Sequence, residues 1–213
     1  MSKLDVDFGG WMQEAFTLYK RNFAVLLLVN LIALVLSSVT LFILSGPLYA
    51  GVVIVTLALL DGTSPKPEAG DVFKGFQFFL PSFLLMLVVL GASMLVGMVL
   101  GPLSSVATWV LSTLTMFSIF LIVEKKMDFW PSIVASYEMV KENFWVMLAL
   151  VVVASILSTL GFLACCIGIF VTMPYYYCVM AVAYRKVTGA PAASAAAADD
   201  EPLVRVSPPP PAT

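Results

Sequence analysis

The chain has 213 residues, of which 61% are hydrophobic and 11% are charged, and its mean hydropathy is +1.02. An average soluble domain carries roughly 25% charged residues, so this composition excludes an ordinary soluble protein. The net charge of −2 gives no reason to expect nucleic acid, and the absence of His removes the commonest metal ligand and general base.

The charged residues are grouped and leave three long stretches without any Asp, Glu, Lys or Arg. These stretches are 22–60 (39 residues), 75–123 (49) and 143–184 (42). Because a helix needs roughly 20 residues to cross the hydrocarbon core, each stretch is long enough for two spans. The sequence therefore predicts an all-α, polytopic membrane protein with six transmembrane helices, at about 22–44, 47–60, 81–100, 103–123, 143–163 and 168–184.

Gly and Pro mark the expected turn within each pair of spans. The turns are predicted at Ser45-Gly46-Pro47, at Gly101-Pro102 and between Gly161 and Pro174. Because Lys and Arg favour the cytoplasmic side, both termini and all charged loops are expected in the cytoplasm. The predicted location is the inner membrane of a bacterium, with only short turns on the outer face.

An amphipathic stretch precedes each pair of spans, and interfacial helices are predicted at about 7–21, 71–80 and 128–142. Asp7, Asp71 and Asp128 are the expected N-caps. Aromatic side chains suit the headgroup level of a bilayer, where these helices are expected mainly to anchor the bundle, with a collar that binds lipid or a partner as the alternative. The candidate lipid or partner contacts are Trp11, Phe16, Tyr19, Phe73, Phe76, Trp130 and Tyr137.

The first and third amphipathic units align without a gap. Lys20-Arg21-Asn22-Phe23 falls over Lys141-Glu142-Asn143-Phe144, and Phe16 falls over Tyr137. The second unit shares the pattern but is more divergent. The sequence thus predicts three repeats of an interfacial helix followed by a transmembrane hairpin.

Hydroxyl side chains follow one face of the fourth predicted span, and a single amide lies well inside the first. Ser and Thr at membrane depth can line a polar path, but they more often pack against neighbouring helices or bond their own backbone. The buried amide is expected to form a hydrogen bond across helices, with a ligand contact as the alternative. The candidate polar residues are Ser104, Thr108, Ser112, Thr115 and Asn30.

Small residues recur at four-residue spacing on the third and fifth predicted spans. Such spacing permits close approach of two helices. Packing within one chain is favoured here over a self-association face. The candidate helix-packing residues are Ser93, Gly97, Gly101, Ala154 and Ser158.

No ionisable residue falls inside a predicted span, which disfavours ion pumps and proton-coupled carriers. The acids that bound the spans, Asp61, Asp71, Glu124 and Asp128, are expected to be caps and solvated turns rather than catalytic pairs. Cys165, Cys166 and Cys178 lack metal-ligand spacing and are expected to pack. No catalytic residue, metal or cofactor is predicted.

The composition changes near residue 188. Segment 188–213 is rich in Ala and Pro and is predicted to be a disordered cytoplasmic tail. The membrane domain is therefore expected to cover 1–187.

Four motifs carry a resemblance to a known group of proteins. They are Phe16 to Phe23, Gly46-Pro47-Leu48-Tyr49-Ala50-Gly51, the Asp61-Gly62 loop with Asp71-Val72-Phe73-Lys74-Gly75-Phe76, and Ser136-Tyr137 to Asn143-Phe144. Over about 5–187 the chain resembles bacterial membrane-protein families of unknown function related to the membrane domain of glycerophosphodiester phosphodiesterases. The resemblance implies a six-helix membrane domain with interfacial helices. The catalytic barrel of those enzymes has no counterpart here, and the resemblance transfers no catalytic residue.

The expected function is therefore non-enzymatic. The chain is interpreted as a scaffold or accessory subunit that packs against other membrane proteins or itself, or that organises membrane lipids. The alternative is a transporter or flippase-like carrier of a lipophilic small molecule, for which the hydroxyl stripe and Asn30 would line the path.

Overall fold

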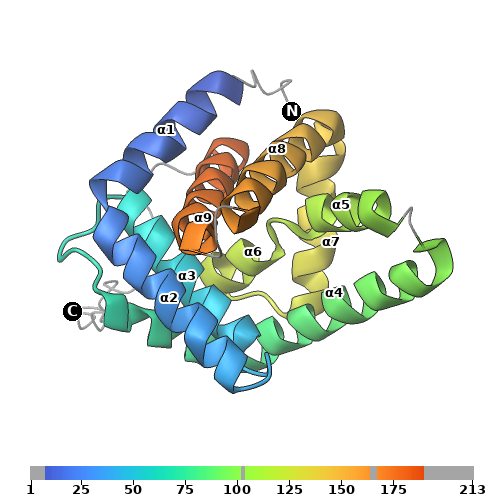
Figure 1. Cartoon of the computed structure of the whole chain (residues 1–213), viewed down its shortest axis with the longest axis horizontal. Coiled ribbons are helices and arrows are strands. Elements are labelled where there is room, and N and C mark those ends of the chain that lie inside the picture. The colour runs from blue at the N-terminus through green and yellow to red at the C-terminus, as the bar shows by residue number, and fades with distance from the viewer. Residues whose placement is uncertain (1–7, 102–103, 164–166, 190–213) are drawn as a thin grey trace, which may run out of the picture.

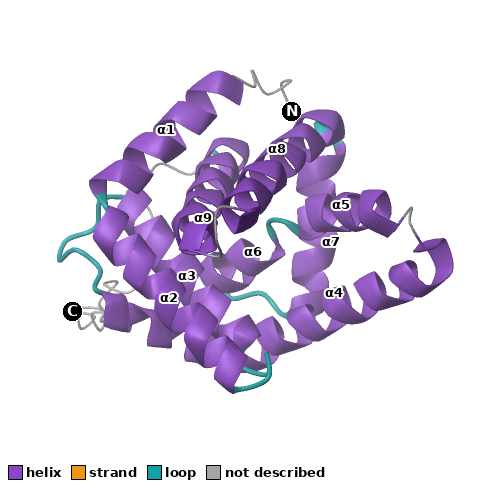
Figure 2. Cartoon of the chain, viewed as in Figure 1, coloured by secondary structure: helices purple, strands orange, loops and turns teal. Residues whose placement is uncertain are grey.

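The computed structural model describes residues 8–101, 104–163 and 167–189. Every regular element within these ranges is a helix (Figure 2), which confirms the all-α prediction. The elements are α1 (Phe8–Arg21), α2 (Phe23–Val39), α3 (Ser45–Leu60), η1 (Ala69–Phe78), α4 (Phe79–Leu100), α5 (Ser104–Thr115), α6 (Ser118–Lys125), α7 (Phe129–Lys141), α8 (Phe144–Leu163) and α9 (Ile167–Thr188). The predicted tail lies outside the described residues from position 190 onward.

Some of these helices are long and apolar enough to cross a membrane. Within the described part of the chain, two segments meet that requirement: Ala69–Leu100, which comprises η1 and α4, and Ser104–Lys125, which comprises α5 and α6. The number rises to four if each of two bent pairs, α1 with α2 and α7 with α8, counts as one span. Helix α3 is apolar but has only 16 residues. The chain therefore has the helices of a membrane protein, while the prediction of six spans goes beyond this count.

Sharp bends separate two amphipathic helices from the apolar helices that follow them. The angle is 88° between α1 and α2 and 106° between α7 and α8. The bends fall at Asn22 and Asn143, the two residues that the sequence alignment superimposes. The next helix begins at each Asn with a backbone hydrogen bond. The Leu26 amide donates to the Asn22 carbonyl at 3.1 Å, and the Met147 amide donates to the Asn143 carbonyl at 3.1 Å. Each amphipathic helix is thus set across the direction of the apolar helix after it.

Of the three predicted turns between paired helices, the first is misplaced. The first turn comprises residues 40–44, where Leu41 and Phe42 have φ values of 51° and 64°. Ser45-Gly46-Pro47 instead forms the first turn of α3, where Pro needs no hydrogen-bond donor. Gly101 does end α4 with a positive φ of 51°, as a turn residue should. The boundary between α8, which ends at Leu163, and α9, which begins at Ile167, falls between Gly161 and Pro174 as predicted, and Pro174 itself lies inside α9.

The fourth predicted span is two helices, because α5 ends at Thr115 and α6 begins at Ser118. Ser136 of α7 satisfies backbone groups at this break. Its hydroxyl donates to the carbonyl of Leu114 at 2.8 Å and accepts from the amide of Phe117 at 3.2 Å. A side chain from another helix therefore replaces bonds that a continuous helix would form internally.

The second amphipathic unit is a 3₁₀ helix, η1, rather than an α-helix. Glu68 is its N-cap, and Asp71 is the third helical residue of a capping box instead of the predicted N-cap. Asp128 does occupy the N-cap position of α7, although its side chain makes no capping bond. The predicted cap Asp7 lies outside the described residues.

Helix α3 is the centre of the fold, because most of its side chains are buried. It packs most closely on η1 through two glycines. A Cβ on Gly75 would lie 2.1 Å from the carbonyl oxygen of Pro47 and 2.3 Å from the amide nitrogen of Gly51, so neither helix has room for a side chain there. In contrast, α4 runs along one edge (Figure 1) and exposes a row of large apolar residues that includes Leu87, Met94 and Met98.

Candidate functional site

Four polar side chains meet where α3, α6 and α9 end, and we call this group the ionic cluster. It consists of Asp61, Glu124, Tyr184 and Arg185. Arg185 donates to Asp61 from Nε at 3.0 Å and from Nη2 at 2.5 Å, and it donates to Glu124 from Nη1. The Tyr184 hydroxyl donates to the other oxygen of Glu124 at 2.5 Å. Each carboxylate thus has a charged or phenolic donor.

The ionic cluster is largely shielded from solvent. The side chains of Asp61, Arg185 and Glu124 are 1%, 7% and 20% exposed. Burial raises the pKa of the Asp61 carboxyl, and the hydrogen bonds and charge of Arg185 oppose that rise. Carboxylates at helix C-termini are unfavourable because the helix dipole is negative there. Arg185 offsets this repulsion at two helix ends simultaneously.

The prediction of solvated acidic turns is therefore wrong for Asp61 and Glu124. Asp61 does cap the end of α3, but its carboxylate is buried against a residue 124 positions away. A sequence signal did exist. Each of the three charge-free stretches is followed at once by a member of the cluster: Asp61, Glu124 and Arg185. Opposite charges at equivalent helix ends could have indicated this contact.

A cavity of about 340 Å³ lies among α3, α4, α5, α6 and α9. Its wall is mainly apolar, with Met and Leu side chains, and includes Tyr49, Tyr176 and Tyr177. The rings of Tyr49 and Tyr177 stack at 5.9 Å. Ser112 and Thr115, two members of the predicted polar stripe, also line it.

The other predicted polar residues do not line this cavity. Ser104 and Thr108 lie further toward the start of α5. Asn30 is buried on α2, where its amide donates to the carbonyl of Leu26 at 2.9 Å within its own helix. Its Oδ1 has no hydrogen-bond partner among the described residues. The expected bond across helices is thus replaced by a local one.

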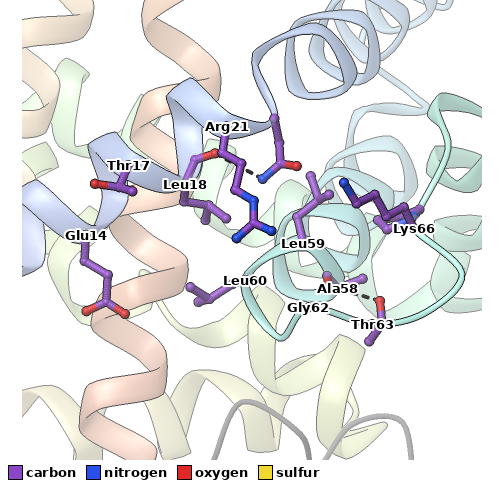
Figure 3. A pocket seen from close by; sticks show the side chains of 12 residues that line it. Glu14, Thr17, Leu18, Arg21, Ala58, Leu59, Leu60, Gly62, Thr63 and Lys66 are labelled. Carbon is purple, nitrogen blue, oxygen red and sulfur yellow. Dashed lines mark hydrogen bonds between the residues drawn. The ribbon is translucent and has the colours of Figure 1, made fainter.

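A second pocket, of about 270 Å³, lies between α1 and the end of α3 (Figure 3). Arg21 and Lys66 reach into it from opposite walls, and Glu14 lies at its far end. Glu14 is paired with Lys186 at 2.8 Å. Because α2 begins and α3 ends at this pocket, it lies at the boundary between charged and apolar sequence. The sequence reasoning did not single out Arg21 and Lys66 as a pair.

The candidate aromatic contacts divide into exposed and buried groups. Phe16, Phe73, Trp130 and Tyr137 are exposed, and Phe76 is half-buried with its ring 6.2 Å from that of Phe73. Trp11 and Tyr19 are buried in the main core. The expected lipid or partner contact is therefore wrong for these two, whose helix α1 packs on α9. Exposure of the other aromatic rings leaves them available to a surrounding bilayer or partner.

The predicted packing residues also divide. Ala154 is buried in the core, but a Cβ on Gly97 or Gly101 would meet nothing within 4 Å. The hydroxyl of Ser93 bonds the carbonyl of Val89 in its own helix at 2.7 Å. Packing within the chain is therefore wrong for the spacing on α4, where the close contacts lie instead at Gly46, Gly51 and Gly75. The side chain of Ser158 lies outside the described residues.

Comparison of the chain with protein-family models, curated proteins and solved structures finds no match. Within the described ranges, no three His, Cys, Asp or Glu side chains are grouped as metal ligands would be. The observations define an all-α protein with some helices long and apolar enough to cross a membrane, a buried ionic cluster and two separate pockets. The resemblance to phosphodiesterase membrane domains stays a prediction.

Proposed function

We propose that the chain is a six-span protein of the bacterial inner membrane, with both termini in the cytoplasm, that organises lipid or holds other membrane proteins and catalyses no reaction. The observation that carries this proposal is the pair of bends at Asn22 and Asn143. They set α1 and α7 across the apolar helices, as expected of amphipathic helices that lie in the membrane interface. Exposed Phe16, Trp130 and Tyr137 supply the aromatic side chains typical of that level.

Helix lengths support the six-span arrangement. At 1.5 Å per residue, the 17 residues of α2 and the 16 of α3 extend about 24–26 Å, and the 20 of α8 and 22 of α9 extend about 30–33 Å. These lengths approach the roughly 30 Å of a hydrocarbon core. The ionic cluster supports the same topology, because Asp61, Glu124 and Arg185 lie at the ends of α3, α6 and α9 and contact one another.

The topology can be tested with fused reporters. A reporter placed after Gly101 should be extracytoplasmic, and one placed after Lys126 should be cytoplasmic. The reverse pattern would overturn the orientation. The function can be tested by affinity purification of the full chain from its native host in mild detergent, with mass spectrometry of proteins and lipids. A stoichiometric membrane protein or an enriched class of phospholipid supports the proposal, and a chain that recovers neither contradicts it.

The cavity among the helices favours a second candidate function, the carriage of a lipophilic small molecule. Ser112, Tyr176 and Tyr177 line the cavity, and their hydroxyls have no hydrogen-bond partner among the described residues. An unpaired hydroxyl is costly in an apolar medium, so a ligand with a polar group would be stabilised there. The double variant Ser112→Ala/Thr115→Val should then reduce uptake of the lipophilic molecule into vesicles that contain the protein. The control Thr108→Val changes a hydroxyl outside the cavity and should leave uptake unchanged.

A further inference from the structure

We infer that the pocket between α1 and the end of α3 binds the phosphate group of an anionic phospholipid, with Arg21 and Lys66 as its cationic ligands. This inference rests on the proposed lipid-organising function and names the lipid class and the site. The pocket volume of about 270 Å³ is enough for a phosphate headgroup. Arg21 and Lys66 approach that space from separate elements, the last turn of α1 and the loop after α3 (Figure 3).

The charge of the pocket is set by its side chains. Neither Arg21 nor Lys66 forms an ion pair or hydrogen bond among the described residues. Glu14, the one acidic residue of the lining, already pairs with Lys186 at 2.8 Å. The helix dipoles do not favour an anion here, since the negative ends of α1 and α3 reach the pocket together with the positive end of α2, so the attraction comes from the side-chain cations. Two free cations are therefore left for an anion.

The surroundings indicate a lipid rather than a free phosphate ion. Leu18, Leu59 and Leu60 line the same pocket, which gives it an apolar wall beside the cations. The charge-free stretch of the first two spans begins at residue 22 and ends at residue 60, so the pocket lies where that stretch meets charged sequence. A headgroup at this level would place its acyl chains along the apolar helices. Arg also forms paired hydrogen bonds to phosphate oxygens, and Lys supplies a compact charge.

The test is native mass spectrometry of the full chain in mild detergent, titrated separately with phosphatidylglycerol and phosphatidylcholine. The wild-type chain should prefer phosphatidylglycerol. The expected loss of relative affinity is about fivefold for each cation removed in Arg21→Gln and Lys66→Gln, the factor that corresponds to about 1 kcal/mol per basic residue at an anionic surface. The variant Arg21→Lys/Lys66→Arg should retain most of the preference.

The matched control is Lys125→Gln/Lys126→Gln, which removes two exposed cations at the C-terminal end of α6, outside the pocket. This control should keep the preference for phosphatidylglycerol. An unchanged preference in Arg21→Gln/Lys66→Gln, or an equal loss in the control, would overturn the inference. If the chain binds inorganic phosphate through Arg21 and Lys66 but shows no lipid preference, the pocket binds free phosphate and the assignment to a phospholipid is wrong.

This experiment separates the inference from the broader function. If the pocket variant keeps its lipid preference while the purified chain still enriches phospholipid, only the assigned site is wrong. If the wild-type chain recovers neither lipid nor protein partner from its host, the proposed function itself is wrong. Unfolding midpoints of all variants, measured by tryptophan fluorescence, should stay close to that of the wild type, because the four cations have no ion pair or hydrogen bond among the described residues and Arg21 and Lys125 lose only the modest attraction of a helix C-terminus.

Discussion

Arg185 and Asp61 form a two-bonded pair, Nε to one carboxylate oxygen at 3.0 Å and Nη2 to the other at 2.5 Å, across 124 positions of sequence. The pair joins the end of α9 to the end of α3, and Glu124 adds the end of α6. This contact links helices from all three predicted repeats. It is a charged contact at the edge of a core that consists mainly of apolar side chains.

Replacing Arg185 with Met should destabilise the chain strongly. The substitution leaves Asp61 and Glu124 shielded from solvent without their cation, and breaking a buried pair in this way costs about 3–5 kcal/mol. The free energy of unfolding in mixed micelles measures the effect. Lys186→Met is the control, because its pair with Glu14 is exposed and such pairs contribute about 0–1 kcal/mol.

The combined variant Asp61→Asn/Glu124→Gln/Arg185→Met tests the same explanation. It removes the stranded negative charges and should recover part of the lost stability. If Arg185→Met and Lys186→Met have equal, small effects, the ionic cluster does not stabilise the fold.

Gly75→Ala should disrupt the contact between η1 and α3. The new methyl group would lie 2.1 Å from the Pro47 carbonyl oxygen, so the two helices would have to separate. Overpacking of this kind costs about 1–3 kcal/mol or more. Gly97→Ala is the matched control in an open helical position, where Ala should stabilise by about 0.5–1 kcal/mol. A destabilised Gly97→Ala chain would instead show that this face of α4 is covered by another molecule.

Ser136→Ala should cost about 1–3 kcal/mol, because it strands the Leu114 carbonyl and the Phe117 amide at the break between α5 and α6. Hydrogen exchange at the Phe117 amide should also accelerate. Ser132→Ala is the control on the same helix, since that hydroxyl bonds only the nearby Phe129 carbonyl at 2.7 Å. Equal effects of both substitutions would mean that Ser136 does not hold the break.

Asp71 should make the stability of the chain depend on pH. Its carboxylate accepts from the Glu68 amide at 2.9 Å and pairs with Lys74 at 3.0 Å, and these contacts hold its pKa below the usual value. The stabilisation is therefore present above the unfolded pKa of about 3.9 and is lost as the pH falls through the lower folded pKa. Asp71→Ala should cost about 1 kcal/mol at neutral pH, the net value of the hydrogen bond that it accepts from the Glu68 amide in the capping box.

The difference between the wild type and Asp71→Ala should shrink as the pH approaches about 3. Unfolding midpoints across this range measure it. Asp128→Ala is the control, because Asp128 occupies an N-cap position without a side-chain capping bond. A difference that stays constant with pH would contradict a role for the ionised Asp71 side chain.

Patterns among residues that are close together in the sequence predicted much of this fold. Charge-free stretches located the apolar helices, and helical spacing of aromatic residues located α1 and α7. The alignment of Asn22 with Asn143 matched two bends in the structure. Local patterns could not place the first turn, because Leu41 and Phe42 adopt positive φ without a Gly to mark them.

The candidate sites were harder to predict because they depend on distant contacts. The hydroxyl stripe was found, yet only packing decides that Ser112 and Thr115, not Ser104 and Thr108, reach the cavity. Small-residue spacing suggested close contact at Gly97, whereas the contact occurs at Gly75, which has no such spacing partner in its own helix. Arg21 and Lys66 are 45 positions apart, and only the fold brings them to one pocket.

The ionic cluster also has a consequence for the order of synthesis. Asp61 and Glu124 are synthesised well before Arg185. Until α9 has been made, each carboxylate therefore lies near the negative end of a helix without its cation. A chain stopped before residue 185 cannot neutralise either one. Arg185 is thus the last residue of the ionic cluster to be made, and the ends of α3 and α6 reach their final stability only when α9 has packed beside them.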